Sequence, residues 1–177
     1  MSDLAAAERA LHKTFGFETF RPGQGDIVAA ILDGQDVLAV MPTGSGKSLC
    51  YQLPALIRDG LTIVVSPLIA LMRNQVAQLR GYGVAAAALN SANDPAENRK
   101  ILDQIARGEL RLVYVSPERL VKADTLDLFR RAKVALLAVD EAHCISQWGH
   151  DFRPEYAALG AVQAELGGVQ TVAFRCV

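Results

Sequence analysis

The sequence of 177 residues has no long hydrophobic run, few cysteines and almost no net charge. No apolar stretch reaches the roughly 18 residues that a membrane-spanning helix needs, which argues against a transmembrane protein. The 18 basic and 19 acidic side chains give a net charge of −1, so the chain as a whole lacks the basic character of nucleic-acid-binding domains. Hydrophobic residues make up 51% of the sequence, and this share with the low net charge excludes a mainly disordered chain.

Cysteine occurs only three times, as Cys50, Cys144 and Cys176. These positions are too far apart in the sequence for a Cys-x-x-Cys metal or redox motif. The odd number and the wide spacing are typical of a reducing cytosol. The N-terminus has neither the basic patch nor the apolar run of a secretory signal. We therefore expect a cytoplasmic protein that has no membrane partner.

Apolar runs of strand length alternate along the chain with segments of helical apolar spacing. The strand-like runs are residues 36–40, 61–66, 84–89, 112–116, 135–139 and 169–174. The helical segments are residues 24–32, 48–58, 69–81, 95–107, 117–131 and 155–166. This alternation predicts an α/β fold with a mostly parallel sheet and helices on both faces. No linker rich in Pro, Gly or Ser divides the chain, so residues 1–177 are expected to form one domain.

A glycine-rich segment lies between the first predicted strand and the following helix. Residues 41–48 read Met-Pro-Thr-Gly-Ser-Gly-Lys-Ser, which fits the phosphate-loop pattern except that Met41 stands at its first glycine position. Gly44 and Gly46 allow backbone conformations that turn successive N–H groups toward phosphate oxygens. A chance Gly-x-Gly-Lys-Ser/Thr in a chain of this length is on the order of one in a hundred. The segment therefore indicates a site for a nucleoside triphosphate.

The loop supplies candidate ligands for ATP and for Mg²⁺. The Lys47 ammonium can reach the β- and γ-phosphates, and the Ser48 hydroxyl can bind Mg²⁺. The expected nucleotide-binding residues of the loop are Thr43, Gly44, Ser45, Gly46, Lys47 and Ser48. The pattern does not say which process the energy of the triphosphate drives.

Two carboxylates, Asp140 and Glu141, follow the apolar run at residues 135–139. Ligands of parallel sheets gather at the carboxyl ends of the strands, so we expect Asp140 to face the phosphate loop and to hold Mg²⁺ through water. Glu141 would orient or deprotonate the attacking water. Lys47, Asp140 and Glu141 are therefore the expected catalytic residues. Without the phosphate loop, such a pair would be interpreted as a solvated turn.

An aromatic segment at residues 146–154 follows the acidic pair. It contains the only tryptophan, Trp148, together with Phe152 and Arg153. Aromatic rings beside arginine suit stacking on unpaired bases, which is worth about 1–3 kcal/mol per base. Packing of the two rings against the core is an equally good interpretation of the composition. His143 could link the nucleotide site to this segment by hydrogen bonding.

The motifs and their order resemble the RecQ family of ATP-dependent DNA helicases, which belongs to superfamily 2. The strongest resemblance lies in residues 140–156, Asp-Glu-Ala-His-Cys-Ile-Ser-Gln-Trp-Gly-His-Asp-Phe-Arg-Pro-Glu-Tyr. Residues 20–24 resemble the adenine-recognition motif of that family, residues 66–75 its motif Ia and residues 114–120 its motif Ib. The match extends from about residue 11 to residue 174.

The resemblance implies the first RecA-like lobe, a P-loop three-layer sandwich, of a 3′-to-5′ helicase of DNA repair and recombination. It implies that Arg21 and Gln24 recognise adenine, with Gln24 reading the base edge. It further implies that an aromatic-rich loop couples single-stranded DNA to ATP hydrolysis. The residues with this implied role are His143, Gln147, Trp148, His150, Phe152 and Arg153. The implied partners are ATP with Mg²⁺ and DNA, both single strands and duplex junctions, whereas the sequence leaves the oligomeric state open.

The sequence departs from the family after Phe174, where Arg-Cys-Val replaces a Thr-Ala-Thr-Ala-like motif. The abrupt loss of the match favours a frameshift, with a premature stop or a cut fragment as alternatives. The second RecA-like lobe and the C-terminal domains of the family are then missing, and with them an arginine finger worth roughly 10³–10⁵-fold in rate. We expect the chain alone to bind ATP–Mg²⁺ weakly, to hydrolyse it very slowly and not to unwind DNA.

Two other functions stay open from the residues alone. One is a non-catalytic module that retains nucleotide or DNA contacts. The other is a different superfamily 2 motor, such as an RNA helicase of the Asp-Glu-Ala-Asp type. Such a helicase would carry Asp in place of His143 and would lack the aromatic segment.

Overall fold

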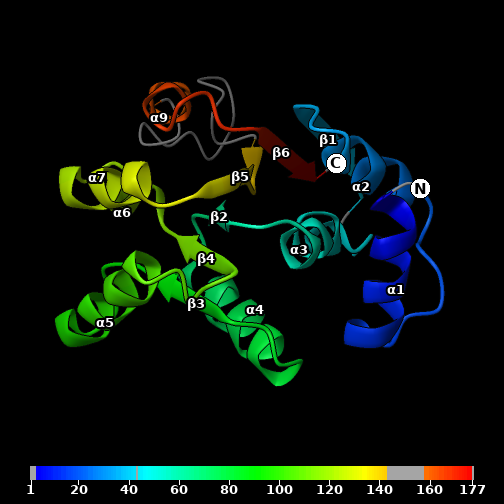
Figure 1. The fold of residues 1–177 in the computed structure, drawn as a ribbon, viewed down its shortest axis with the longest axis horizontal. Helices are drawn as coiled ribbons and strands as arrows, with labels where there is room; N and C mark the ends of the chain where they lie inside the picture. The colour runs from blue at the N-terminus through cyan, green and yellow to red at the C-terminus, as the bar shows by residue number, and fades with distance from the viewer. Residues whose placement is uncertain (1–2, 43, 143–157, 177) are drawn as a thin grey trace.

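The structure is a computed structural model that describes residues 3–42, 44–142 and 158–176. Within these residues, six strands form one sheet in the order β1-β6-β5-β2-β4-β3, and neighbouring strands are parallel (Figure 1). The strands are β1 (Val37–Met41), β2 (Leu61–Val65), β3 (Ala86–Leu89), β4 (Leu112–Val115), β5 (Val134–Val139) and β6 (Thr171–Cys176). The helices are α1 (Asp3–Phe15), α2 (Gln24–Leu32), α3 (Lys47–Ile57), α4 (Ile69–Gly81), α5 (Pro95–Ala106), α6 (Pro117–Leu120), α7 (Ala123–Arg131) and α9 (Leu159–Glu165).

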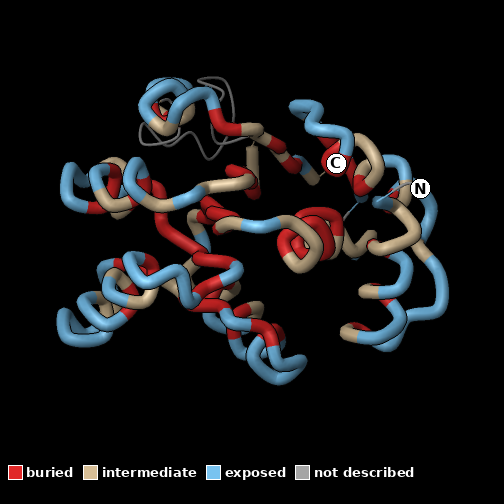
Figure 2. Tube along the Cα trace, in the orientation of Figure 1, coloured by how far each residue is buried: buried red, intermediate tan, exposed pale blue. Residues whose placement is uncertain are grey.

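Helices cover both faces of this sheet, so the molecule has three layers. Helices α1 to α4 pack on one face, and α5, α6, α7 and α9 pack on the other (Figure 1). Successive strand residues point to opposite faces, and in β2 Val64 belongs to the first core whereas Ile63 and Val65 belong to the second. The buried residues accordingly follow the strands through the middle of the molecule (Figure 2). The predicted α/β fold with a parallel sheet and two helical layers is confirmed.

Local sequence signals explain where several helices begin. Helix α5 starts after Asp94, whose side chain accepts a hydrogen bond of 2.9 Å from the Ala96 N–H, and Pro95 occupies its first turn. Both features are typical helix starts, because the cap satisfies an unpaired donor and proline needs none. The predicted helices at residues 24–32 and 69–81 have the predicted bounds.

Three helical regions differ from the prediction. Helix α1 was not among the predicted helices, although its buried Ala7, Leu11 and Phe15 recur every four residues on one face. The single helix predicted at residues 117–131 is two helices, α6 and α7, because Lys122 adopts an extended backbone that ends the first and precedes the second. The helix predicted at residues 155–166 is described only as α9 (Leu159–Glu165), since its beginning lies outside the described residues.

The strand order determines what lies together at the carboxyl edge of the sheet. Strand β6 pairs with β1 on one side and with β5 on the other. The loop after β1, the end of β6 and the residues after β5 are therefore neighbours, although they are far apart in sequence. None of the described helices is long and apolar enough to span a membrane.

A close backbone approach at Gly60 gives a test of this fold. Gly60 has φ 107°, and a Cβ there would lie 2.8 Å from the Lys133 carbonyl oxygen, which accepts the hydrogen bond of the Leu61 N–H. Gly108 also has a positive φ of 69°, but a Cβ there would meet no atom within 4 Å. We expect Gly108→Ala to cost about 1–2 kcal/mol from backbone strain alone, and Gly60→Ala to cost distinctly more.

Thermal unfolding of the two variants measures this difference. At this chain length each kcal/mol lowers Tm by about 2–4 °C. Equal Tm values for the two variants would show that β2 and β5 do not approach each other at Gly60 as described.

Candidate nucleotide site

The phosphate-loop segment connects β1 to α3 in the predicted manner. Gly44 and Gly46 both have left-handed backbones, with φ of 79° and 77°. A Cβ at Gly46 would also meet the end of the Gln24 side chain, which would have to move, so it is mainly the left-handed backbone that favours glycine here. Helix α3 begins at Lys47, and Gly46 offers no capping side chain to its first N–H groups. The positive end of the helix macrodipole is thus directed at the loop, as anion binding requires.

Two side chains from the start of α2 brace this loop. The Arg21 guanidinium donates a hydrogen bond of 2.7 Å to the Gly44 carbonyl, and Gln24 Nε2 donates one of 2.9 Å to the Gly46 carbonyl. Gln24 Oε1 in turn accepts a hydrogen bond of 2.8 Å from the Arg21 N–H. Gln24 is only 1% exposed. The Gly44 and Gly46 carbonyls are thus bound from outside the loop, and these bonds hold the loop in its conformation.

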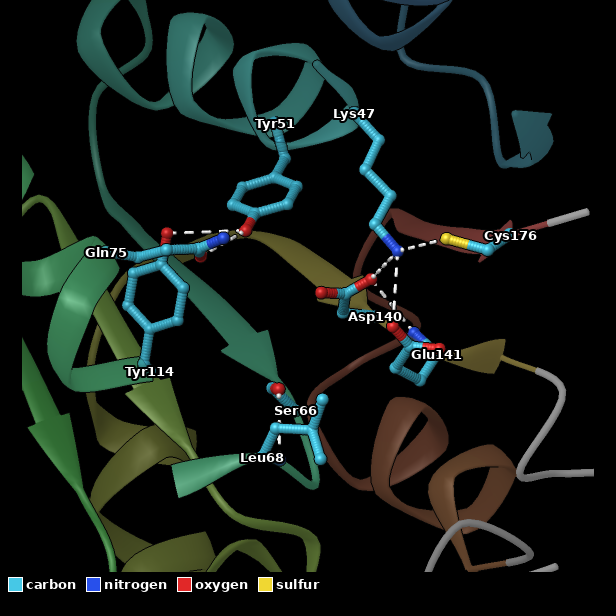
Figure 3. Close-up of polar contacts among 9 residues, drawn as sticks. All are labelled: Lys47, Tyr51, Ser66, Leu68, Gln75, Tyr114, Asp140, Glu141 and Cys176. Carbon is cyan, nitrogen blue, oxygen red and sulfur yellow. Dashed lines mark hydrogen bonds and ion pairs between the residues drawn. The ribbon is translucent and has the colours of Figure 1, made fainter. Parts of the chain in front are cut away.

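Lys47 connects the loop to the ends of two neighbouring strands (Figure 3). Its ammonium lies 3.0 Å from Asp140 Oδ1 and 3.3 Å from Glu141 Oε1, both directly after β5. It also donates a hydrogen bond of 3.0 Å to the Sγ atom of Cys176, the last residue of β6. The structure therefore brings together Lys47, Asp140 and Glu141, the three predicted catalytic residues.

The electrostatics of this cluster favour a charged lysine. Burial lowers the pKa of Lys47, but the hydrogen bond to Cys176 and the charges of Asp140 and Glu141 outweigh it, so the pKa lies above its usual value. Asp140 is 2% exposed, and burial raises the pKa of its carboxyl, while the Lys47 charge acts in the opposite direction. The buried carboxylate thus depends on a nearby cation to stay ionised.

Glu141 has an unusual backbone at this point. Its φ of 56° places it in the left-handed region, the one such non-glycine residue among those described. Its N–H donates a hydrogen bond of 2.9 Å to Asp140 Oδ1. A non-glycine residue in this region stores about 1–3 kcal/mol of strain, a feature that clusters at functional sites. The turn directs both carboxylates to the Lys47 ammonium.

The donor groups present fit a triphosphate and Mg²⁺. The Ser45 hydroxyl, inside the loop, is buried and has no hydrogen-bond partner among the described residues, so a phosphate oxygen would satisfy it. Ser48 and Asp140 offer oxygen ligands of the kind that Mg²⁺ prefers. The described residues contain no group of three or more His, Cys, Asp or Glu that could hold a metal by themselves.

A buried hydrogen-bond network joins α3 to the segments that resemble motifs Ia and Ib. Tyr51, one helical turn after Lys47, donates a hydrogen bond of 3.0 Å to Gln75 in α4, and its hydroxyl lies 3.3 Å from that of Tyr114 in β4 (Figure 3). Gln52 Nε2 donates to the same Tyr114 hydroxyl at 3.0 Å. Burial raises the pKa of Tyr114 to about 12 and that of Tyr51 well above its usual value. Both phenols therefore stay protonated at neutral pH.

Several predicted site residues lie outside the described residues. They are Thr43, His143, Gln147, Trp148, His150, Phe152 and Arg153. The sequence analysis does not predict the hydrogen bond between Lys47 and Cys176. Nor does it predict the hydrogen bonds of Tyr51 with Gln75 and Tyr114. The position of Cys176 just after a predicted strand could have pointed to it, since parallel strands end at one edge. Tyr51 could have been found four residues after Lys47, on the same helix face.

The sequence of this chain matches a known protein family and several curated proteins. Residues 21–174 match the family model of the DEAD/DEAH box helicases. The chain belongs to this family. Among curated proteins, it is 51% identical over 88% of its length to the ATP-dependent DNA helicase RecQ of Haemophilus influenzae. It is 47% identical over 93% of its length to the probable ATP-dependent DNA helicase RecS of Bacillus subtilis. Within the DEAD/DEAH box helicases, the chain is of the RecQ type.

This RecQ-type chain spans only part of its relatives. The match covers 25% of the Haemophilus protein and 33% of the Bacillus protein. Among solved structures, the Mycobacterium smegmatis helicase Lhr superposes with a TM-score of 0.75 at 23% identity, over 97% of this chain and 24% of Lhr. The DEAD-box helicase Mss116 superposes with a TM-score of 0.72 at 20% identity, over 94% of this chain and 38% of Mss116. These superpositions confirm the RecA-like fold of the lobe.

The two described cysteines of the RecQ-type lobe should differ in reactivity. Cys176 is partly exposed beside the Lys47 ammonium, whereas Cys50 is fully buried and burial raises the pKa of its thiol to about 12. At pH 8 Cys50 is therefore a protonated thiol that a reagent cannot reach. We expect iodoacetamide to alkylate Cys176 and to leave Cys50 unmodified.

Peptide mass spectrometry of the folded Cys144→Ser variant checks this prediction, because only these two thiols remain. Unfolding in guanidinium provides the control, since it should expose both thiols equally. Alkylation of Cys50 at the rate of Cys176 in the folded protein would contradict the described packing of α3.

Proposed function

We propose that residues 1–177 form the ATP-binding first RecA-like lobe of a 3′-to-5′ DNA helicase. The observation that carries the proposal is the Lys47 ammonium, which the loop after β1 places against the carboxylates after β5. A cation that is adjacent to a helix N-terminus and balanced by two acids can exchange those acids for phosphate oxygens. The family and the curated relatives support ATP as the nucleotide.

Each residue of the cluster has a distinct role in this proposal. Lys47 binds the β- and γ-phosphates, and loop N–H groups with the Ser45 hydroxyl bind the remaining oxygens. Ser48 and Asp140 would hold Mg²⁺, which when bound neutralises phosphate charge and orients the triphosphate. Glu141 loses its ammonium partner when Lys47 turns to the phosphates. Its carboxylate can then orient the attacking water and accept the proton.

Arg21 and Gln24 are proposed to recognise the adenine base while they brace the loop. Their hydrogen bonds to the Gly44 and Gly46 carbonyls hold both side chains against the phosphate loop. Contacts to the base would therefore act on the same two side chains that set the conformation of the loop. This arrangement supports a site that senses base and phosphates together.

DNA binding and its coupling to ATP hydrolysis are proposed for residues 143–153. The composition of this segment, with Trp148, Phe152 and Arg153, supports stacking on unpaired bases. The segment begins two residues after Glu141. The Tyr51 hydrogen bonds join α3 to α4 and β4, the elements that carry the Ia-like and Ib-like segments. The nucleotide site and the proposed DNA track thus share buried contacts.

Replacing Lys47 tests the nucleotide site. A hydrogen bond to a charged group contributes about 1.5–3 kcal/mol, so we expect Lys47→Ala to weaken the binding of a fluorescent ATP analogue about 10- to 100-fold. The matched control is Lys100→Ala, which removes an exposed lysine of α5 and should leave the affinity unchanged. Titration by fluorescence, with circular dichroism to verify folding, measures both. Equal affinity of the wild type and Lys47→Ala would contradict the proposal.

A second candidate function is a nucleotide- or DNA-binding module without motor activity. It concerns these 177 residues by themselves, which span 25% of the Haemophilus relative's length. We propose that the 177-residue polypeptide binds ATP–Mg²⁺, hydrolyses it very slowly and does not unwind duplex DNA.

An assay of phosphate release with and without single-stranded DNA tests this second proposal. We expect a rate lower by roughly 10³–10⁵-fold than that of a motor with its arginine finger in place. Rapid DNA-stimulated turnover that Lys47→Ala abolishes would show instead that the 177 residues are a complete ATPase.

A further inference from the structure

Two aromatic side chains from separate parts of the sequence line one cavity beside the phosphate loop. Phe17, between α1 and α2, is 43% exposed, and Tyr82, directly after α4, is 48% exposed. Both line a cavity of about 250 Å³. Aromatic rings carry a large apolar surface, and two of them on one cavity indicate a surface that a planar apolar ligand can cover.

The same cavity reaches the residues that brace the phosphate loop. Arg21 and Gln24 line it, and so do Gly46 and Ser48 at the beginning of α3. A nucleotide with its phosphates at the start of α3 therefore has this cavity within reach of its base. The volume lies below the roughly 300–1,000 Å³ of pockets that enclose whole drug-sized ligands. The cavity thus fits a base, with the sugar and phosphates outside it.

Tyr82 is held in place before any ligand binds. Its ring meets the ring of Phe15 edge to face, with 5.1 Å between the centroids and 68° between the planes. Its N–H donates hydrogen bonds of 3.1 Å to the Gln78 and Leu79 carbonyls at the end of α4. The hydrogen bonds hold the backbone and the Phe15 contact restrains the ring, so the ring loses less conformational entropy when a ligand stacks on it.

We propose that Tyr82 is a base-contacting residue of the nucleotide site and favours purine over pyrimidine nucleotides. The proposal rests on the ATP binding proposed above, and it adds the residue that follows α4 to a site otherwise built from the start of α2, the phosphate loop and the end of β5. A two-ring base covers more of the Tyr82 and Phe17 faces than a one-ring base does. The ring of Tyr82 supplies this contact, so its hydroxyl is dispensable.

Affinities for three ligands separate a base contact from a structural role. The ligands are Mg²⁺–ATP, Mg²⁺–CTP and Mg²⁺–tripolyphosphate, which has the phosphates but no base. By isothermal titration calorimetry, we expect Tyr82→Ala to weaken ATP on the order of tenfold, to weaken CTP less and to leave tripolyphosphate unchanged. Tyr82→Phe keeps the ring and should bind all three like the wild type. Leu38→Ala, which truncates a 70% exposed side chain of β1, is the matched control and should change none of them.

Three outcomes would overturn the proposal or its basis. Unchanged ATP affinity in Tyr82→Ala would show that the base does not contact this ring. An equal loss for ATP and tripolyphosphate would show that Tyr82 acts through packing against Phe15 and not through the base. If the wild type binds neither ATP nor tripolyphosphate, the proposed nucleotide site itself is wrong.

Discussion

The candidate site is held together by the contact of one ammonium with the ends of two neighbouring strands. Lys47 begins α3, and its Nζ atom reaches over the end of β6 at Cys176 to Asp140 after β5. This contact is possible only because β6 lies between β1 and β5 in the sheet. The carboxylate of Asp140 is buried and is stabilised by the same cation. The fold therefore builds a site in which the partner of Lys47 can be exchanged.

The layers around the sheet hold this contact in place. On one face, Arg21 and Gln24 at the start of α2 bind the carbonyl groups of the loop, so the loop is fixed from behind. On the same face, Tyr51 carries hydrogen bonds from α3 to Tyr114 in β4 and to Gln75 in α4. Movement of α3 would disturb these bonds, and this is the physical basis for linking nucleotide binding to the proposed DNA track.

Much of this arrangement was predictable from the sequence. The features that were not predicted depend on interactions that apolar spacing does not reveal. The sequence predicts that the phosphate loop and the acidic pair lie at one edge of the sheet, because the carboxyl ends of parallel strands share an edge, and the structure brings Lys47, Asp140 and Glu141 together there. Helix α1 was missed because its alanine-rich sequence has few large apolar residues to mark its buried face. The break at Lys122 depends on local backbone geometry that apolar spacing does not reveal. The contact of Cys176 with Lys47 depends on strand order, which a sequence alone does not determine. The proposed role of Tyr82 depends on a cavity whose lining comes from α1, α2, α3 and α4.

In the proposed function, a nucleotide phosphate binds the Lys47 ammonium in place of its present partners Asp140, Glu141 and Cys176. Cys176 reports this directly, because its sulfur lies 3.0 Å from the Lys47 ammonium. The decisive measurement is the rate at which iodoacetamide alkylates Cys176 in the Cys144→Ser variant, with and without saturating Mg²⁺–ATP. We expect the nucleotide to slow this reaction strongly and Lys47→Ala to remove most of the protection. An alkylation rate that does not respond to nucleotide would contradict the claim that the triphosphate binds at this cluster.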